Sequence, residues 1–174
     1  MLTALSVVIL VPSVLEVFSY TLPAFAGMLT IFAVIELDKK WALGIYAATS
    51  LLGLLLIPNK EAVVLYTVFF GYYPVIKAVL ESRLPRFAEY LVKFLIFNAA
   101  LVIDFFVMTK IFMVPFDRFM GIEGETGSWV KYIVPIMVAL GNLVFIAFDF
   151  AITQFVTTYL RVWQKRFRKM FRFR

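Results

Sequence analysis

Residues 87–114 read FAEYLVKFLIFNAALVIDFFVMTKIFMV, a run of 28 residues that contains only four charged side chains. A helix needs about 17–25 consecutive, mostly apolar residues to cross the hydrocarbon layer of a bilayer. This pattern predicts an all-α protein, a compact bundle of six transmembrane helices that forms a single domain over residues 1–174. The five further apolar stretches are residues 2–20, 22–37, 41–57, 62–80 and 129–160.

The composition of the whole chain supports a membrane protein. Of the 174 residues, 63% are hydrophobic and 16% are charged, and the mean hydropathy is +0.95. A soluble domain carries about 25% charged residues. Because the chain has neither cysteine nor histidine, disulfides and the Ser-His and Cys-His catalytic systems are excluded. We expect no metal site, no cofactor and no enzymatic activity.

Basic residues are distributed unevenly between the predicted connections. Seven of the 17 basic residues fall in the tail, residues 161–174. The positive-inside rule therefore predicts a multi-pass protein of the cell membrane with both termini in the cytoplasm. The tail mixes basic and aromatic residues, which indicates an anchor on anionic lipid and no binding of nucleic acid. The other basic residues that this topology places on the cytoplasmic side are Lys39, Lys40, Arg83 and Arg86.

Polar side chains inside the apolar stretches are candidates for function, because an ionisable group at mid-membrane costs about 2.5–3.5 kcal/mol. A rise of about 1.5 Å per residue predicts that Glu16, Asp104 and Asn142 lie at similar depth in the outer half. The same estimate places Asn98 level with Asp149, deeper in the membrane. We therefore expect a polar pocket between the fifth and sixth helices that opens outward. Its excess of carboxylates favours an amine-bearing or hydrogen-bond-rich ligand.

Aromatic residues are expected to line this pocket. Each residue assigned to the pocket has an alternative interpretation, in which it has a structural role and contacts no ligand. Asn and Asp in membrane helices also hold helices together, at about 0.6 kcal/mol per contact. Gly71 and Pro74 are expected to kink the fourth helix, which often accompanies a cavity. The aromatic candidates are Trp129, Tyr132, Tyr72, Tyr73 and Tyr20.

Two other features have functional interpretations. Gly44 and Ala48 form a small-xxx-small pattern on the third helix, which is typical of close helix–helix approach and makes them candidates for docking a partner. The predicted membrane helices contain two aspartates, Asp104 and Asp149. Aspartyl intramembrane proteases also have two such aspartates, which act as a dyad to activate water. The sequences around them lack the Gly-x-Gly-Asp motif of that class.

The segment from Leu55-Leu56-Ile57-Pro58 to Phe69-Phe70-Gly71-Tyr72-Tyr73-Pro74 resembles the substrate-binding S components of energy-coupling factor (ECF) vitamin transporters. The likeness extends to the layout of the whole chain. It implies a ligand pocket near the outer face, built by the first loop and helices four to six. It also implies docking to a membrane T component with two ATPase subunits. In that family an Ala-xxx-Ala pattern on the first helix often docks the T component, whereas here Val8 follows Ala4.

The resemblance implies a membrane-embedded subunit that binds a small metabolite or vitamin outside and delivers it inward. The chain has no Gly-x-x-x-x-Gly-Lys-Ser/Thr motif, so a separate module must supply ATP hydrolysis. The alternative from another class is a structural membrane protein of the MreD type, which acts in cell shape and has a similar size and helix count. Such a scaffold does not need acidic residues that converge in the outer half.

Overall fold

The computed structural model describes residues 1–15, 18–119 and 130–163. Every regular element within these residues is helical, which confirms the all-α prediction. Among them, three helices are long and apolar enough to cross a membrane: Lys60–Arg83, Arg86–Ile111 and Tyr132–Arg161.

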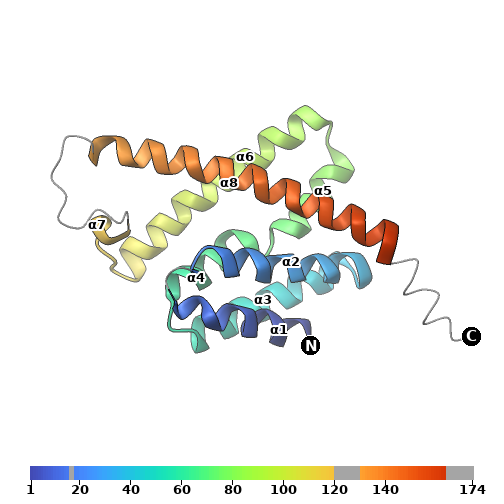
Figure 1. Ribbon diagram of the computed structural model, residues 1–174, viewed down its shortest axis with the longest axis horizontal. Helices are drawn as coiled ribbons and strands as arrows, with labels where there is room; N and C mark the ends of the chain where they lie inside the picture. Colours follow the sequence, from blue (N-terminus) through green and yellow to red (C-terminus); the bar gives the residue numbers. More distant parts are fainter. Residues whose placement is uncertain (16–17, 120–129, 164–174) are drawn as a thin grey trace, which may run out of the picture.

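The first part of the chain forms a group of three mutually packed helices, α1 (Leu2–Leu10), α2 (Thr21–Glu36) and α3 (Lys39–Leu56). They lie together in the lower part of Figure 1, and we call them the first layer. The predicted boundaries of the second and third helices are confirmed to within two residues. Asp38 precedes α3 as its N-cap residue, and its side chain accepts a hydrogen bond from the Lys39 N–H; aspartate is favoured at this position.

The predicted first helix, residues 2–20, is too long. Helix α1 ends at Leu10 and continues as one 3-10 turn, η1 (Val11–Val14), before Leu15 becomes extended. Pro12 lies at the start of this turn, and its ring does not fit an α-helix that continues past it. The first two helices are therefore separate elements, and α1 with η1 is a shorter apolar helix than the three long ones.

The predicted fourth helix is interrupted in its middle. Helix α4 (Lys60–Leu65) passes into a π-helical segment, η3 (Tyr66–Phe70), and α5 (Tyr73–Arg83) begins after a turn. A Cβ atom at Gly71 would lie 2.5 Å from the Tyr46 ring and 2.8 Å from the Tyr66 ring. Only glycine fits there, and Pro74 occupies the first turn of α5. The predicted kink is confirmed.

The last part of the chain forms a second group of helices, which lies mostly above the first in Figure 1 and which we call the second layer. Helix α6 (Arg86–Phe106) continues as the π-helical segment η4 (Val107–Ile111), followed by the short helix α7 (Phe116–Phe119). Helix α8 (Val130–Thr158) crosses α6 and continues as η5 (Tyr159–Trp163). The predicted fifth and sixth stretches are confirmed to within three residues at each end.

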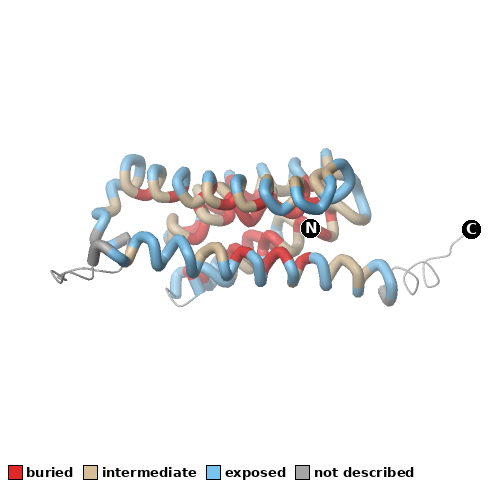
Figure 2. The backbone as a smooth tube through the Cα atoms, turned by 90° about the horizontal axis from the view of Figure 1, so that it is seen from above, coloured by how far each residue is buried: buried red, intermediate tan, exposed pale blue. Residues whose placement is uncertain are grey.

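The buried parts of the chain, red in Figure 2, gather in the middle of the molecule, and an aromatic cluster lies among them. The rings of Phe97 on α6 and Phe145 on α8 are stacked, with centroids 4.7 Å apart. Phe69 of η3 packs edge-on against both of them, with centroids 5.1 and 5.8 Å away. Such pairs add about 0.5–1.5 kcal/mol each to the burial of their area. This cluster therefore joins α6 and α8 to the interrupted fourth helix.

The connections between helices gather at two ends of the molecule (Figure 1). At one end, which we call the Asn59 end, the Asn59 amide donates to the Ser19 hydroxyl at 2.8 Å and also to the Ser13 carbonyl. At the other, the Glu36 end, the Tyr159 hydroxyl donates to Glu36 Oε1 at 2.7 Å. These bonds join connections that are far apart in the sequence.

Candidate functional site

Buried or half-buried polar side chains occur at three successive levels of α6. Lys93, Asn98 and Asp104 follow one another along the helix, and each meets a different part of the molecule. Lys93 and Asp104 are 11 residues apart, which corresponds to about 16 Å along the helix axis. The three levels are therefore separate sites.

The first level is a cluster of charged residues, which we call the ion cluster and which joins α5, α6 and α8. Lys77 Nζ lies 2.5 Å from Asp149 Oδ1 and 2.8 Å from Glu81 Oε1. Lys93 Nζ lies 3.0 Å from the same Glu81 oxygen, 2.5 Å from Glu89 Oε1 and 3.3 Å from Asp149. The ion cluster thus consists of Lys77, Glu81, Glu89, Lys93 and Asp149.

Every lysine and carboxylate of the ion cluster has an oppositely charged partner. Lys77 and Lys93 are only 3% and 1% exposed, whereas the Glu81 side chain is 40% exposed. The Tyr73 hydroxyl donates a further hydrogen bond to Asp149 Oδ1 at 2.5 Å. Charges taken out of water need this degree of pairing to be tolerated. The arrangement is typical of a structural ion network that holds three helices together.

The second level is a reciprocal amide pair between α6 and α8. Asn98 Nδ2 donates to Asn142 Oδ1 at 3.0 Å, and Asn142 Nδ2 donates to Asn98 Oδ1 at 3.2 Å. Each amide also donates at 2.8 Å to a backbone carbonyl one turn earlier, of Phe94 or of Val138. Both amides are thus satisfied within the protein, which favours the role of interhelical contact.

The third level is Asp104, which lies near the Asn59 end. Its side chain is 6% exposed, and Oδ1 has no hydrogen-bond partner among the described residues. The Glu61 carboxylate at the start of α4 is close enough to interact with it electrostatically. We call Asp104 and Glu61 the carboxylate pair.

Tyr20 is the third member of this site. Its hydroxyl donates to Glu61 Oε1 at 2.5 Å. Partial burial of the phenol and the neighbouring Glu61 carboxylate raise the pKa of Tyr20, so its hydroxyl stays protonated and acts as a donor at neutral pH. This hydrogen bond connects the loop between α1 and α2 to the carboxylate pair.

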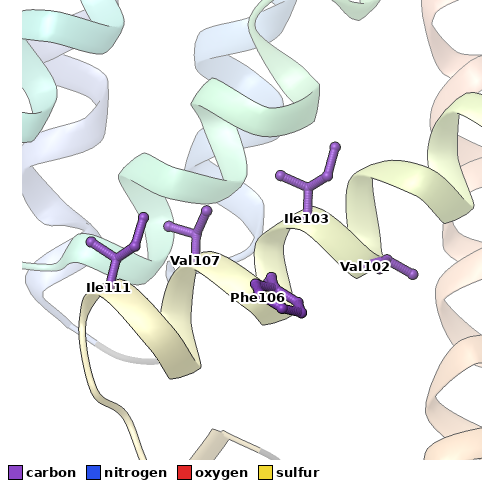
Figure 3. Close-up of a pocket in the computed structure, with 5 residues that line it drawn as sticks. All are labelled: Val102, Ile103, Phe106, Val107 and Ile111. Atoms are coloured by element: carbon purple, nitrogen blue, oxygen red, sulfur yellow. The ribbon is translucent and has the colours of Figure 1, made fainter.

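Two cavities follow the exposed side of α6, and apolar side chains dominate both. A groove of about 350 Å³, which we call the α6 groove, follows the last part of α6 and continues along η4 (Figure 3). A shallower groove of about 530 Å³ lies nearer the first level and includes Asn98. The α6 groove is lined by Val102, Ile103, Phe106, Val107 and Ile111.

The single polar pocket expected between the fifth and sixth helices is not formed. Asp149 belongs to the ion cluster, Asn142 pairs with Asn98, and Asp104 Oδ1 is bonded to neither of them. The depth estimate treated the two helices as parallel, whereas α6 and α8 cross (Figure 1). Asn142 meets Asn98, six residues before Asp104, and Asp149 meets Lys93, five residues before Asn98, so the pairing is shifted by about one and a half helical turns.

The aromatic candidates are dispersed as well. Tyr73 contacts Asp149 in the ion cluster. Tyr72 packs edge-on against Tyr46, with centroids 5.8 Å apart. Tyr132 is exposed near the start of α8. The two remaining candidates, Glu16 and Trp129, lie outside the described residues.

The proposed docking residues on α3 face outward. Gly44 is exposed, and a Cβ atom built there would meet nothing within 4 Å. Ala48, one turn further, is half-buried. Gly44 is therefore not required by packing inside the protein, in contrast to Gly71.

The sequence analysis missed both lysines of the ion cluster and their glutamate partners. The sequence did contain a signal for them. Two oppositely charged pairs, Lys77–Glu81 and Glu89–Lys93, are each spaced by four residues, one on each side of the turn between α5 and α6. Residues at this spacing lie on one face of a helix. Among the described residues, no group of three or more His, Cys, Asp or Glu side chains is placed to hold a metal ion.

Comparison with protein families, with curated proteins and with solved structures gives no match for this chain.

Proposed function

We propose that this protein is a membrane-embedded substrate-binding subunit that takes up a small metabolite through a site at the carboxylate pair. It is a multi-pass protein of the cell membrane, with six spans and both termini in the cytoplasm. The three long apolar helices, the shorter apolar helices of the first layer and the gathering of connections at two ends support this topology. In this orientation the Asn59 end faces outward.

One observation carries the proposal, namely the unpartnered oxygen of Asp104. A buried polar atom without a hydrogen bond costs about 1–3 kcal/mol, and more when it is charged. The ion cluster and the amide pair are satisfied within the protein, so they have no need of a ligand. Asp104 Oδ1, by contrast, has no hydrogen-bond partner among the described residues. An ionisable group inside a membrane protein is by default a functional candidate.

The binding test compares Asp104→Asn with the wild-type protein. A thermal-shift screen of small metabolites on the purified protein identifies stabilising compounds. We expect Asp104→Asn to weaken their binding about 5- to 150-fold, which corresponds to about 1–3 kcal/mol for one charge-assisted hydrogen bond. The matched control is Asp38→Asn, which removes an exposed carboxylate at the Glu36 end and keeps a good N-cap residue. Equal binding by both variants and the wild type would contradict the proposal.

The topology can be tested by labelling introduced cysteines. The chain has no cysteine of its own, so each variant carries a single labelling site. Single cysteines are introduced at the exposed positions Lys40, Pro58 and Arg83. We expect a membrane-impermeant maleimide to label Pro58→Cys in intact cells, and to label Lys40→Cys and Arg83→Cys only after permeabilisation. Labelling of all three from the same side would exclude six spans with alternating connections.

The proposed partners are a membrane T component and two ATPase subunits, as the ECF resemblance implies. The exposed Gly44 and the half-buried Ala48 are the candidate contacts on this chain, because small residues allow close approach of a partner helix. Membrane lipid covers the remaining apolar surface.

A scaffold of the MreD type is the second candidate function. Its supporting observation is the apolar exposed surface of α8, which includes Val134, Ile136, Met137 and Leu140 on successive turns. A scaffold would offer such a surface to partner helices. It predicts that Asp104→Asn leaves every interaction intact. The intramembrane protease gains no support, because Asp149 on α8 belongs to the ion cluster at the first level, whereas Asp104 on α6 forms the third level.

A further inference from the structure

We propose that one water molecule is bound inside the protein, between the hydroxyls of Thr30 on α2, Thr49 on α3 and Tyr66 at the start of η3. We call these three residues the hydroxyl site. It shares no residue with the carboxylate pair, so this inference does not rest on the proposed function.

The first argument concerns buried hydroxyls that lack a hydrogen bond. Thr30, Thr49 and Tyr66 are each 0% exposed, and none of their hydroxyl oxygens has a hydrogen-bond partner among the described residues. Burying a hydroxyl without a hydrogen bond is costly. Most buried polar side-chain atoms have a partner in the protein or in ordered water. Three such hydroxyls therefore indicate a partner that is not part of the chain.

The second argument concerns the packing of Tyr66 against α3. A Cβ atom at Gly71 would lie 2.8 Å from Cζ of Tyr66, the ring carbon that carries the hydroxyl, and 2.5 Å from the Tyr46 ring. The centroids of the two tyrosine rings are 6.3 Å apart. Tyr46 and Thr49 are three residues apart, so they share a face of α3. This packing places the Tyr66 hydroxyl beside the part of α3 that contains Thr49.

The packing of α2 brings in the third hydroxyl. A Cβ atom at Gly27 would overlap the backbone carbonyl of Phe70, which directly precedes Gly71. Thr30 follows Gly27 by three residues, on the same face of α2. Thr30 is therefore directed towards the same segment of the fourth helix, close to the end of the Tyr66 ring.

The third argument concerns the kind of ligand. Thr30 and Thr49 both interact with the Tyr66 hydroxyl, yet no direct hydrogen bond of normal geometry joins the three oxygens. Water has two donors and two acceptors, and each hydroxyl can donate as well as accept. A buried water typically makes about three hydrogen bonds to groups that otherwise have none. The hydroxyl site offers this number.

A metal cation fits this site less well than water does. The described groups that interact with the Tyr66 hydroxyl are Thr30, Thr49 and Tyr46, and none of them is charged. A buried cation without a counter-charge would be very costly.

The hydroxyl site lies where the fourth helix is interrupted. Tyr66 is the first residue of the π-helical segment η3, and water that inserts beside a helix is one of the known causes of a bend. A water bound there would join α2, α3 and η3 by hydrogen bonds as well as by apolar packing. We therefore expect it to stabilise the interruption.

Three substitutions test the site, because each removes one hydroxyl and keeps most of the side-chain volume: Thr30→Val, Thr49→Val and Tyr66→Phe. Loss of one hydrogen bond to the water should lower the unfolding midpoint of each variant by about 2–4 °C. Without a bound water, each substitution would instead remove an unsatisfied hydroxyl and raise the midpoint. Thr158→Val, at an exposed position of α8, is the matched control and should leave the midpoint unchanged.

The variant with all three substitutions tests whether the hydroxyls share one partner. Once the site is apolar, it should stay dry, as apolar cavities do, and no hydroxyl is left without a partner. We therefore expect the triple variant to lose less than the sum of the three single losses, since groups in one network are not additive. Additive losses would show that the hydroxyls act independently and would overturn the shared site.

The occupant is tested by a crystal structure grown from a lipidic mesophase, at a resolution that shows ordered water. We expect one density peak at hydrogen-bond distance, about 2.5–3.0 Å, from all three hydroxyl oxygens, and no such peak in the triple variant. Direct hydrogen bonds from Tyr66 to the two threonines, with no peak between them, would overturn the proposal. A higher unfolding midpoint in every single variant would do the same.

Discussion

Replacing Asp149 with Ala is expected to lower the free energy of unfolding by about 3–5 kcal/mol. Asp149 is the carboxylate that α8 contributes to the ion cluster, and Lys77 lies 2.5 Å from it. Without it, the almost fully buried Lys77 and Lys93 lose a partner that no other residue of α8 replaces. The change is measured from reversible unfolding of the purified protein in mixed micelles.

A double variant tests whether the loss comes from an unbalanced charge. Lys77→Met with Asp149→Leu removes both members of the closest ion pair and fills their volume with apolar atoms. Such replacements are often neutral or stabilising, so we expect the double variant to recover most of the lost stability. Asp104→Asn is the control and should change stability by less than about 1 kcal/mol, because Asp104 Oδ1 has no hydrogen bond to lose. A double variant less stable than Asp149→Ala would contradict this account.

Replacing Gly27 with Ala is the second substitution with a large expected effect. A Cβ atom at Gly27 would overlap the backbone carbonyl of Phe70, where α2 packs against the end of the π-helical segment η3. Backbone cannot move aside as the end of a side chain can, so we expect destabilisation by about 1–3 kcal/mol. Thermal unfolding of the purified variant measures it.

Gly44→Ala is the matched control for Gly27, because it makes the same change in a neighbouring helix. The space around Gly44 is open, and alanine is favoured over glycine inside a helix by about 0.5–1 kcal/mol. We therefore expect Gly44→Ala to keep or raise stability. The bulkier Gly44→Leu should also fold, and it should weaken co-purification of a T component if α3 docks that partner. Equal destabilisation by Gly27→Ala and Gly44→Ala would refute the contact with Phe70.

Length and apolar character allowed most of the helices to be predicted from the sequence. The second, third, fifth and sixth stretches end within three residues of their predicted limits. The break near Gly71 followed from glycine and proline, which are local signals. The first helix was predicted too long, because apolar character alone continues past Pro12 to Tyr20 and hides the end of the helix.

The candidate site was harder to predict, because it depends on how helices cross. Asp104 was expected to line a pocket between the fifth and sixth helices, whereas it interacts electrostatically with Glu61 on α4, a residue that the sequence did not single out. Lys77 and Lys93 lie within two turns of the charged turn at residues 81–86. A lysine side chain at that distance can ordinarily extend to the interface, so neither residue stood out. Their convergence on Asp149 is a tertiary feature.

The spacing of the ion cluster has a consequence for synthesis. Lys77–Glu81 and Glu89–Lys93 each form within a single helix, so both lysines acquire a counter-ion before α8 has been translated. In the proposed topology, the hairpin of α5 and α6 therefore enters the bilayer without two unpaired ammonium groups, each of which would cost about 2.5–3.5 kcal/mol. Asp149 is translated last and meets two lysines that already have a carboxylate partner. Asp149 reaches both lysines at one position of α8 along its axis. We therefore expect the ion cluster to fix how deeply α8 lies in the membrane.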